Sequence, residues 1–324
     1  MNSKDIDKKM DDIEEPEADQ EIDTDQDSVR DVESSDKKKG DESDFELDFS
    51  VVGVGASAGG LEALENFFKN MPVDSGLAFV VIQHLSPDYK SLMVELLSKH
   101  TEMEVLRVED GMKIKPNQVY LIPPKKNMTL FHGKLYLTEQ NSGHGLNLPI
   151  DIFFRSMAED LGERSIGIIL SGTGSDGTLG LRAIKGAGGM VMVQDETSAK
   201  FDGMPRSAIS TGLVDYILAV EEMGEQLIKY TKHPFVSKIE QKTNNKMANE
   251  DSFSKVLSLI RTRTGIDFTF YKPNTIVRRI ERRISVNQVE NTDEYLNLLM
   301  QIPNEIDVLY KELLIGVTKF FRDK

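Results

Sequence analysis

The sequence contains no cysteine, which excludes disulfide bonds, thiol catalysis and cysteine-ligated metals. Its five histidines lack the clustered spacing of a metal site, so we expect no zinc and no other metal. No apolar run approaches the roughly 18 residues of a membrane-spanning helix. The first residues are charged and lack the apolar core of a secretory signal. These absences predict a cytoplasmic protein without direct membrane insertion.

The net charge of -15 is concentrated at the N-terminal end of the chain. Residues 1–46 hold 19 acidic and 7 basic side chains, net -12, whereas the remaining 278 residues hold 35 and 32, net -3. The N-terminal segment has no aromatic residue before Phe45, so it cannot bury enough apolar surface to offset its ordering entropy. We expect a disordered acidic tail over residues 1–46. Because the remainder is nearly neutral, no nucleic-acid partner is expected.

Short apolar runs alternate with amphipathic segments over residues 47–232. The predicted strands cover residues 51–55, 77–85, 104–108, 118–122, 165–170, 190–194 and 213–218. The predicted helices cover residues 61–70, 89–99 and 149–162 and a stretch that ends at Gly186. This alternation predicts an α/β fold with a doubly wound, mostly parallel sheet, in which sites lie at the carboxyl ends of strands.

Two features interrupt this alternation. Residues 128–131 and 134–138, joined through His132 and Gly133, predict a β-hairpin insertion. A turn is expected at residues 203–205, which contain glycine and proline.

The strand pattern disappears towards the C-terminus. Residues 233–250 carry few apolar groups and are expected to form a linker. Helical periodicity follows over residues 253–264, 274–288, 292–301 and 305–314. Residues 251–324 therefore form a small all-α domain in this prediction.

Residues 47–62 pass from an apolar run into small residues and then into a helical pattern. Residues 55–59 read Gly-Ala-Ser-Ala-Gly and match GxSxG, the turn that exposes a nucleophilic serine between a strand and a helix. Ser57 is therefore the first nucleophile candidate.

The same turn has two other interpretations. Gly53, Gly55 and Ala58 fit a permissive form of the dinucleotide-binding fingerprint. That site would need an acidic residue about 20 positions further on, where this sequence is apolar and inside a predicted strand. Close packing of the helix on the strand is the other interpretation. The turn alone leaves nucleophile, phosphate binding and packing open.

Three predicted strands end near Ser57, His84 and Asp176. Serine is a weak nucleophile and needs an imidazole to take its proton, and the imidazole needs a carboxylate to orient it. Each partner also has a structural interpretation, His84 as a core histidine and Asp176 as a helix cap. Their coincidence at one edge of the sheet favours a catalytic triad, which is defined by geometry and not by chain order.

Four motifs together resemble the catalytic domain of the chemotaxis protein-glutamate methylesterase, CheB. They cover residues 55–60 (Gly-Ala-Ser-Ala-Gly-Gly), 83–85 (Gln-His-Leu), 171–177 (Ser-Gly-Thr-Gly-Ser-Asp-Gly) and 203–208 (Gly-Met-Pro-Arg-Ser-Ala). The resemblance spans about residues 48–232. It implies a serine esterase, a carboxylic ester hydrolase that removes glutamate γ-methyl esters from chemoreceptors and, in many members, deamidates receptor glutamines.

The resemblance also implies roles for individual residues. Ser57 is the nucleophile, His84 the base and Asp176 its orienting partner, while the backbone N–H groups of Ala58 and Thr173 hold the oxyanion. Many family members have methionine at the position of Thr173, which changes the side chain and not the amide. The esterase needs no cofactor. The implied partners are the cytoplasmic domains of methyl-accepting chemoreceptors and a chemotaxis histidine kinase.

The C-terminal part resembles the N-terminal helical domain of the receptor methyltransferase, CheR, on residues 272–283 and 316–323. Helical spacing gathers four arginines on one basic face, for which a solvated surface is the simpler interpretation. The resemblance implies that this face meets acidic receptor helices. The four residues are Arg278, Arg279, Arg282 and Arg283. Thr318 and Arg322 match positions that approach S-adenosylmethionine in the family.

Two departures limit the resemblance. The sequence ends at Lys324, where the S-adenosylmethionine domain of CheR should begin, so this chain is expected not to methylate by itself. The cofactor would serve only a complete methyltransferase. No phosphorylatable receiver domain is expected before Asp48, because the preceding segment is short and polar. The chain thus resembles a CheB-CheR fusion, which implies esterase activity; the alternative is a non-catalytic receptor-binding or scaffold module that retains the esterase fold.

Overall fold

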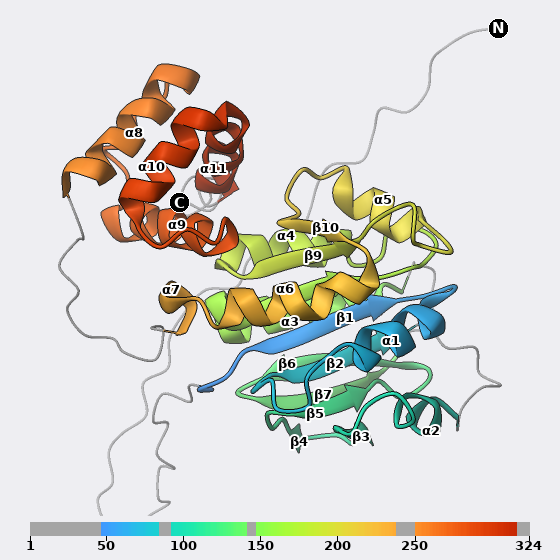
Figure 1. The fold of residues 1–324 in the computed structure, drawn as a ribbon. Coiled ribbons are helices and arrows are strands. Elements are labelled where there is room, and N and C mark those ends of the chain that lie inside the picture. The colour runs from blue at the N-terminus through green and yellow to red at the C-terminus, as the bar shows by residue number, and fades with distance from the viewer. Residues whose placement is uncertain (1–46, 84–91, 141–146, 238–249, 316–324) are drawn as a thin grey trace, which may run out of the picture. The chain divides into compact units, whose positions relative to one another are not determined.

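The structure, a computed structural model, describes residues 47–83, 92–140, 147–237 and 250–315 (Figure 1). Several sequence-based predictions therefore lie outside the described residues: the tail over residues 1–46, His84, the middle of the expected linker at residues 238–249, Thr318 and Arg322.

Seven strands form one parallel sheet. They are β1 (Val51–Ala56), β2 (Ala78–Gln83), β3 (Glu104–Arg107), β5 (Gln118–Leu121), β8 (Ser165–Ile169), β9 (Met190–Gln194) and β10 (Tyr216–Leu218). Their order is β10-β9-β8-β1-β2-β5-β3, and each neighbouring pair is parallel. Strands lie on both sides of β1, with β2, β5 and β3 on one side and β8, β9 and β10 on the other, so the predicted doubly wound α/β fold is confirmed.

Helices cover both faces of this sheet (Figure 1). One face packs against α1 (Gly60–Lys69), α2 (Leu92–Leu97) and α6 (Val220–Thr231). The other packs against α3 (Pro149–Leu161), α4 (Thr178–Ala187) and α5 (Gly203–Ile209). Along β1, Val52 and Val54 belong to the first core and Val51 to the second, as the two-residue period of a strand requires. All six residues of β1 are buried, which explains why the strand reads as a continuous apolar run.

The predicted hairpin is confirmed. Strands β6 (Lys126–Phe131) and β7 (Lys134–Glu139) pair antiparallel, and β4 (Met112–Lys113) adds a third strand. His132 and Gly133 have φ values of 48° and 66°, the left-handed pair that a tight two-residue hairpin needs. Both of their N–H groups donate to the carboxylate of Asp160, at 2.7 and 3.1 Å. The α3 helix thereby anchors the tip of the hairpin.

One local prediction is wrong. Residues 203–205 begin α5 and do not form an isolated turn, because Pro205 lies in the first helical turn, where its missing N–H leaves no intrahelical bond unmade. The expected linker begins with a short helix, α7 (Pro234–Ser237).

Four helices follow: α8 (Glu250–Thr264), α9 (Pro273–Val286), α10 (Thr292–Gln301) and α11 (Pro303–Ile315). They share a core that includes Ile280, Tyr295 and Leu309. The side chain of Asn291 caps α10 by accepting a hydrogen bond from the Glu294 N–H at 3.0 Å. The predicted all-α segment is confirmed. In the described part of the chain, no helix is long and apolar enough to cross a membrane.

Candidate active site

Ser57 lies on the turn between β1 and α1. Strand β1 ends at Ala56 and α1 begins at Gly60. Gly59 has a φ of 71°, and a Cβ atom there would lie 2.8 Å from the Ser171 hydroxyl oxygen, so both conformation and space demand glycine. The Ser57 N–H donates to the carbonyl of Ser171 at 3.0 Å. The small residues of the GxSxG sequence therefore hold the half-buried serine against the loop that follows β8.

This pairing lies where the strand order reverses. The chain runs from β1 to β2 on one side, while β8 joins β1 on the other. Open parallel sheets bind ligands outside the carboxyl ends of strands at such a switch point. The two motifs at residues 55–60 and 171–177 thus meet at the most favourable position in the fold.

Asp176 is buried, with 3% of its surface exposed. Its two carboxylate oxygens accept hydrogen bonds from the N–H groups of Ile150 and Asp151, each at 3.0 Å. These donors belong to the first turn of α3, whose N–H groups have no intrahelical partners. The helix-capping interpretation of Asp176 therefore describes this structure, although the helix it caps is α3 and not its own. Capping also fixes the carboxylate in position, and a carboxylate has acceptor sites for further donors.

Asp151 makes the reciprocal contact and was not singled out from the sequence. Its carboxylate accepts a hydrogen bond from the Gly180 N–H, in the first turn of α4, at 2.6 Å. Burial raises the pKa of Asp151, the Gly180 N–H opposes that shift, and the nearby charge of Asp176 adds to it. The one sequence feature that could have identified Asp151 is its position two residues after Pro149, in the first turn of the predicted helix over residues 149–162.

Because its pKa is raised, the ionised form of Asp151 is less favourable in the folded state than in the unfolded state at neutral pH. Asp151→Asn retains an oxygen acceptor and removes the charge, so we expect wild-type or higher stability at pH 7. Asp151→Ala loses the cap and should be less stable by about 1 kcal/mol. Urea unfolding of both variants at pH 7 measures the difference. An asparagine variant as unstable as the alanine variant would contradict this account.

Two polar side chains support the loop after β8. The Ser171 hydroxyl donates to the carbonyl of Ala58 at 2.9 Å and accepts from the Phe201 N–H at 3.0 Å. The Ser171 N–H donates to the side-chain oxygen of Gln194, which is buried at the end of β9, at 2.8 Å. Gln194 was not predicted as a site residue, and the only signal was a polar residue closing an apolar strand. These bonds connect the turn that carries Ser57 to the loops after β8 and β9.

The two amides proposed for the oxyanion lie on these adjoining loops. Ala58 follows Ser57 directly, and exposed Thr173 follows Gly172. Gly172 packs so closely that an added Cβ would lie 3.0 Å from the Ser57 Cβ atom and 2.2 Å from the sulfur of Met204. The backbone of residues 172–173 therefore adjoins the serine, and the oxyanion role of the Ala58 and Thr173 amides remains a prediction.

His84 directly follows Gln83, the last residue of β2, and itself lies outside the described residues. Gln83 is in register with Ala56, the residue before Ser57. The side-chain oxygen of Gln83 is buried and has no hydrogen-bond partner within the described residues. The chain therefore enters the segment containing His84 at the same edge of the sheet as the serine.

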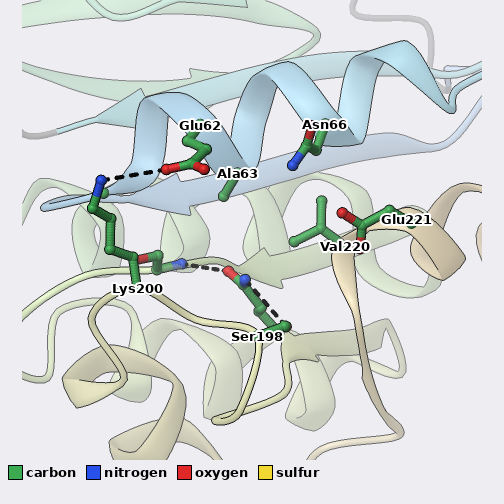
Figure 2. A pocket seen from close by; sticks show the side chains of 10 residues that line it. Glu62, Ala63, Asn66, Ser198, Lys200, Val220 and Glu221 are labelled. Carbon is green, nitrogen blue, oxygen red and sulfur yellow. Dashed lines mark hydrogen bonds and ion pairs between the residues drawn. The ribbon is translucent and has the colours of Figure 1, made fainter.

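A cavity of about 320 Å³ opens beside the turn between β1 and α1 (Figure 2). Gly59 and Ser171 line it on the side of the turn, and α1 and the start of α6 contribute further polar groups. The ammonium of Lys200 lies 3.4 Å from the carboxylate of Glu62 across its rim, and both side chains are exposed (Figure 2). The cavity therefore adjoins the turn that carries Ser57 and is lined by charged and amide side chains.

The arginines of α9 do not form the exposed basic face that the sequence suggested. Arg279, Arg282 and Arg283 are buried, with 5–7% of their surfaces exposed. Only Arg278 is exposed, 3.6 Å from Glu163. The expectation of a solvent-facing basic surface is wrong for three of the four, because periodicity identifies side chains that share a face and not what covers that face. Their role in receptor binding remains a prediction.

The comparisons with known proteins agree with this geometry. The CheB methylesterase family matches residues 52–227, and the all-alpha domain of the CheR methyltransferase matches residues 251–314. The crystal structure of the Thermotoga maritima CheB methylesterase catalytic domain superposes with a TM-score of 0.52 at 30% identity, covering 56% of this chain and 98% of that one.

Curated relatives extend the match. An uncharacterized 104.1 kDa protein of Rhodobacter capsulatus is 39% identical over 251 residues, 71% of this chain and 26% of that protein. A protein-glutamate methylesterase/protein-glutamine glutaminase of Photorhabdus laumondii is 34% identical over 182 residues, 55% of this chain and 52% of the relative. A putative enzyme of the same name from Leptospira interrogans is 31% identical, and the match covers 95% of its length.

This chain thus spans about a quarter of the first relative and about half of the second. The family matches, the parallel sheet and the placement of Ser57 all point the same way. The chain belongs to the CheB methylesterase family, with an all-alpha domain of the CheR methyltransferase type joined behind it.

Proposed function

We propose that this protein hydrolyses the γ-methyl esters of glutamate side chains in the cytoplasmic domains of chemoreceptors. The observation that carries the proposal is the position of Ser57, held at the switch point of the sheet by the carbonyl of Ser171 and by Gly59. Relatives named as protein-glutamate methylesterases support the substrate class, and their second name supports deamidation of glutamine at the same site.

The proposed reaction begins when the Ser57 hydroxyl oxygen attacks the ester carbonyl and His84 takes the serine proton. The amides of Ala58 and Thr173 hold the oxyanion, and methoxide leaves as methanol with the proton from His84. Water then hydrolyses the acyl-serine, releasing glutamate. Asp176 orients His84, and its bonds to the first turn of α3 keep it from moving. No cofactor takes part.

The cavity beside Ser57 suggests how a receptor segment could approach. Its lining combines a cation, Lys200, with the carboxylates of Glu62 and Glu221 and the amide of Asn66. We propose that it accommodates polar residues that flank the methylated glutamate. This role implies a location in the cytoplasm. It also implies a chemotaxis histidine kinase as a partner. S-adenosylmethionine would concern Thr318 and Arg322 only with a complete methyltransferase.

Methanol release from a peptide containing glutamate γ-methyl ester tests the proposal. We expect turnover by the wild-type chain and its loss in His84→Ala, because the serine then has no base. The matched control is the same peptide with aspartate β-methyl ester, which places the ester one methylene closer to the backbone. It should react more slowly. A wild-type chain that binds methylated receptors without releasing methanol would overturn the esterase proposal and favour a scaffold role.

A further inference from the structure

Six charged side chains are buried together where α9 and α11 meet the α/β segment. Their side chains are at most 8% exposed. Lys185 and Asp215 come from the α/β segment, residues 47–232. The other four, Arg282, Arg283, Glu305 and Glu312, come from the helical segment, residues 250–315. We call this set the interface cluster.

The contacts within the interface cluster cross between the two segments. The ammonium of Lys185 lies 2.7 Å from a carboxylate oxygen of Asp215 and 2.7 Å from one of Glu312. The guanidinium of Arg282 donates to both oxygens of Glu312, at 2.8 and 2.9 Å, and also to Asp215. Arg283 reaches Asp215 at 3.2 Å. Each segment therefore places charges against opposite charges of the other.

Arg283 also binds a member of the interface cluster within the helical segment. Its guanidinium donates to the two oxygens of Glu305, at 2.7 and 2.6 Å, a bidentate geometry that fixes both side chains. The cluster thus holds three cations and three anions. Burial of an unpaired charge is very unfavourable, and this balance allows the burial.

Two arginines of α9 also bind the end of α4. Arg279 donates to the carbonyls of Lys185 and Gly186, both at 2.6 Å. Arg282 donates through Nε to the carbonyl of Gly189 at 2.9 Å. The last carbonyls of a helix lack intrahelical partners and carry partial negative charge, so guanidinium groups complement them. Charge and hydrogen-bond geometry therefore both match across this contact.

We propose that the arginine face of α9 is an intramolecular docking surface, and that its partner is the C-terminal end of α4 together with Asp215. The helical segment is bound to the α/β segment in solution through Arg279 and Arg282. An external acidic partner can reach these arginines only by displacing α4. This inference is independent of the proposed esterase reaction.

The absence of native cysteine allows a direct test in the full chain. Cysteines replace exposed Glu159 on α3 and exposed Asn297 on α10, both are spin-labelled, and the distance between them is measured by pulsed electron paramagnetic resonance. We expect one narrow distribution. Arg279→Ala and Arg282→Ala should each replace it with a broad one, while Arg278→Ala, whose side chain is exposed on the same helix, should leave it narrow.

A second label pair within the α/β segment, Ser98→Cys with Glu159→Cys, distinguishes undocking from unfolding. Its distribution should stay narrow in every arginine variant. A broad distribution between the segments in the otherwise unchanged chain would overturn the proposal. So would narrow distributions in both Arg279→Ala and Arg282→Ala, because docking would then not depend on the arginine face.

Discussion

Replacing Ser57 with alanine is expected to lower kcat/KM for methanol release by about 10³-fold or more. The variant retains the proposed oxyanion amides and the binding cavity, so a small residual activity should remain. The turn itself should be preserved, because its bonds to Ser171 and Gly60 are made by the serine backbone. Loss of activity with an unchanged thermal unfolding curve would identify a chemical role.

Ser98→Ala is the control for this experiment, because Ser98 is an exposed serine just after α2 and outside the site. It should retain wild-type kcat/KM. If Ser57→Ala also retained most of the activity, Ser57 could not be the nucleophile, and the GxSxG turn would be explained by helix–strand packing alone.

Replacing Glu312 with alanine should destabilise the protein by about 3–5 kcal/mol, the typical result of breaking a buried charge network. Glu312 contacts Lys185, Arg282 and Arg283, so its removal leaves three buried cations facing fewer anions. Urea unfolding at pH 7 measures the loss. Glu225→Gln is the matched control because that carboxylate pairs with Lys229 on the exposed surface, and no measurable change is expected. If Glu312→Ala lost no more stability than Glu225→Gln, the interface cluster would not be formed in solution.

This destabilisation should depend on pH. Burial alone would raise the pKa of Glu312, but the charges of Arg282, Lys185 and Arg283 outweigh it and hold this pKa well below its usual range. A carboxyl group whose pKa is lowered on folding contributes stability above its unfolded pKa and loses it as pH falls towards the folded value. The difference in the free energy of unfolding between wild type and Glu312→Ala should therefore have its full size at pH 7 and become smaller below about pH 4.

The elements that could be predicted from sequence are those with a clear local pattern of apolar residues. Strand β9 is a continuous apolar run and has the predicted bounds, residues 190–194. The hairpin was equally clear, because His132-Gly133 lies between alternating apolar residues. Ser57 was identified since a GxSxG turn constrains the backbone locally. Such features depend on neighbours in the sequence and need no knowledge of distant contacts.

The contacts that sequence could not reveal are those between distant residues. Asp176 caps α3, which begins 27 residues earlier in the chain at Pro149, and Asp151 caps α4 in return. Helical periodicity placed Arg278 with Arg282 and Arg279 with Arg283, yet burial separates Arg278 from the rest. The partner of a basic helix face is decided by tertiary packing, and a carboxylate such as Asp215 carries no local sign that it supplies that partner.

The most direct test of the account is hydroxylamine trapping of the acyl group during hydrolysis of the γ-methyl ester peptide. An acyl-serine at Ser57 would partition between water and hydroxylamine, so the wild-type chain should form glutamate γ-hydroxamate in addition to glutamate. Ser57→Ala should form no hydroxamate above the uncatalysed rate, and glutamate only at its small residual rate. Hydrolysis by the wild type without hydroxamate, or hydroxamate formation by Ser57→Ala at the wild-type rate, would contradict a covalent mechanism at Ser57.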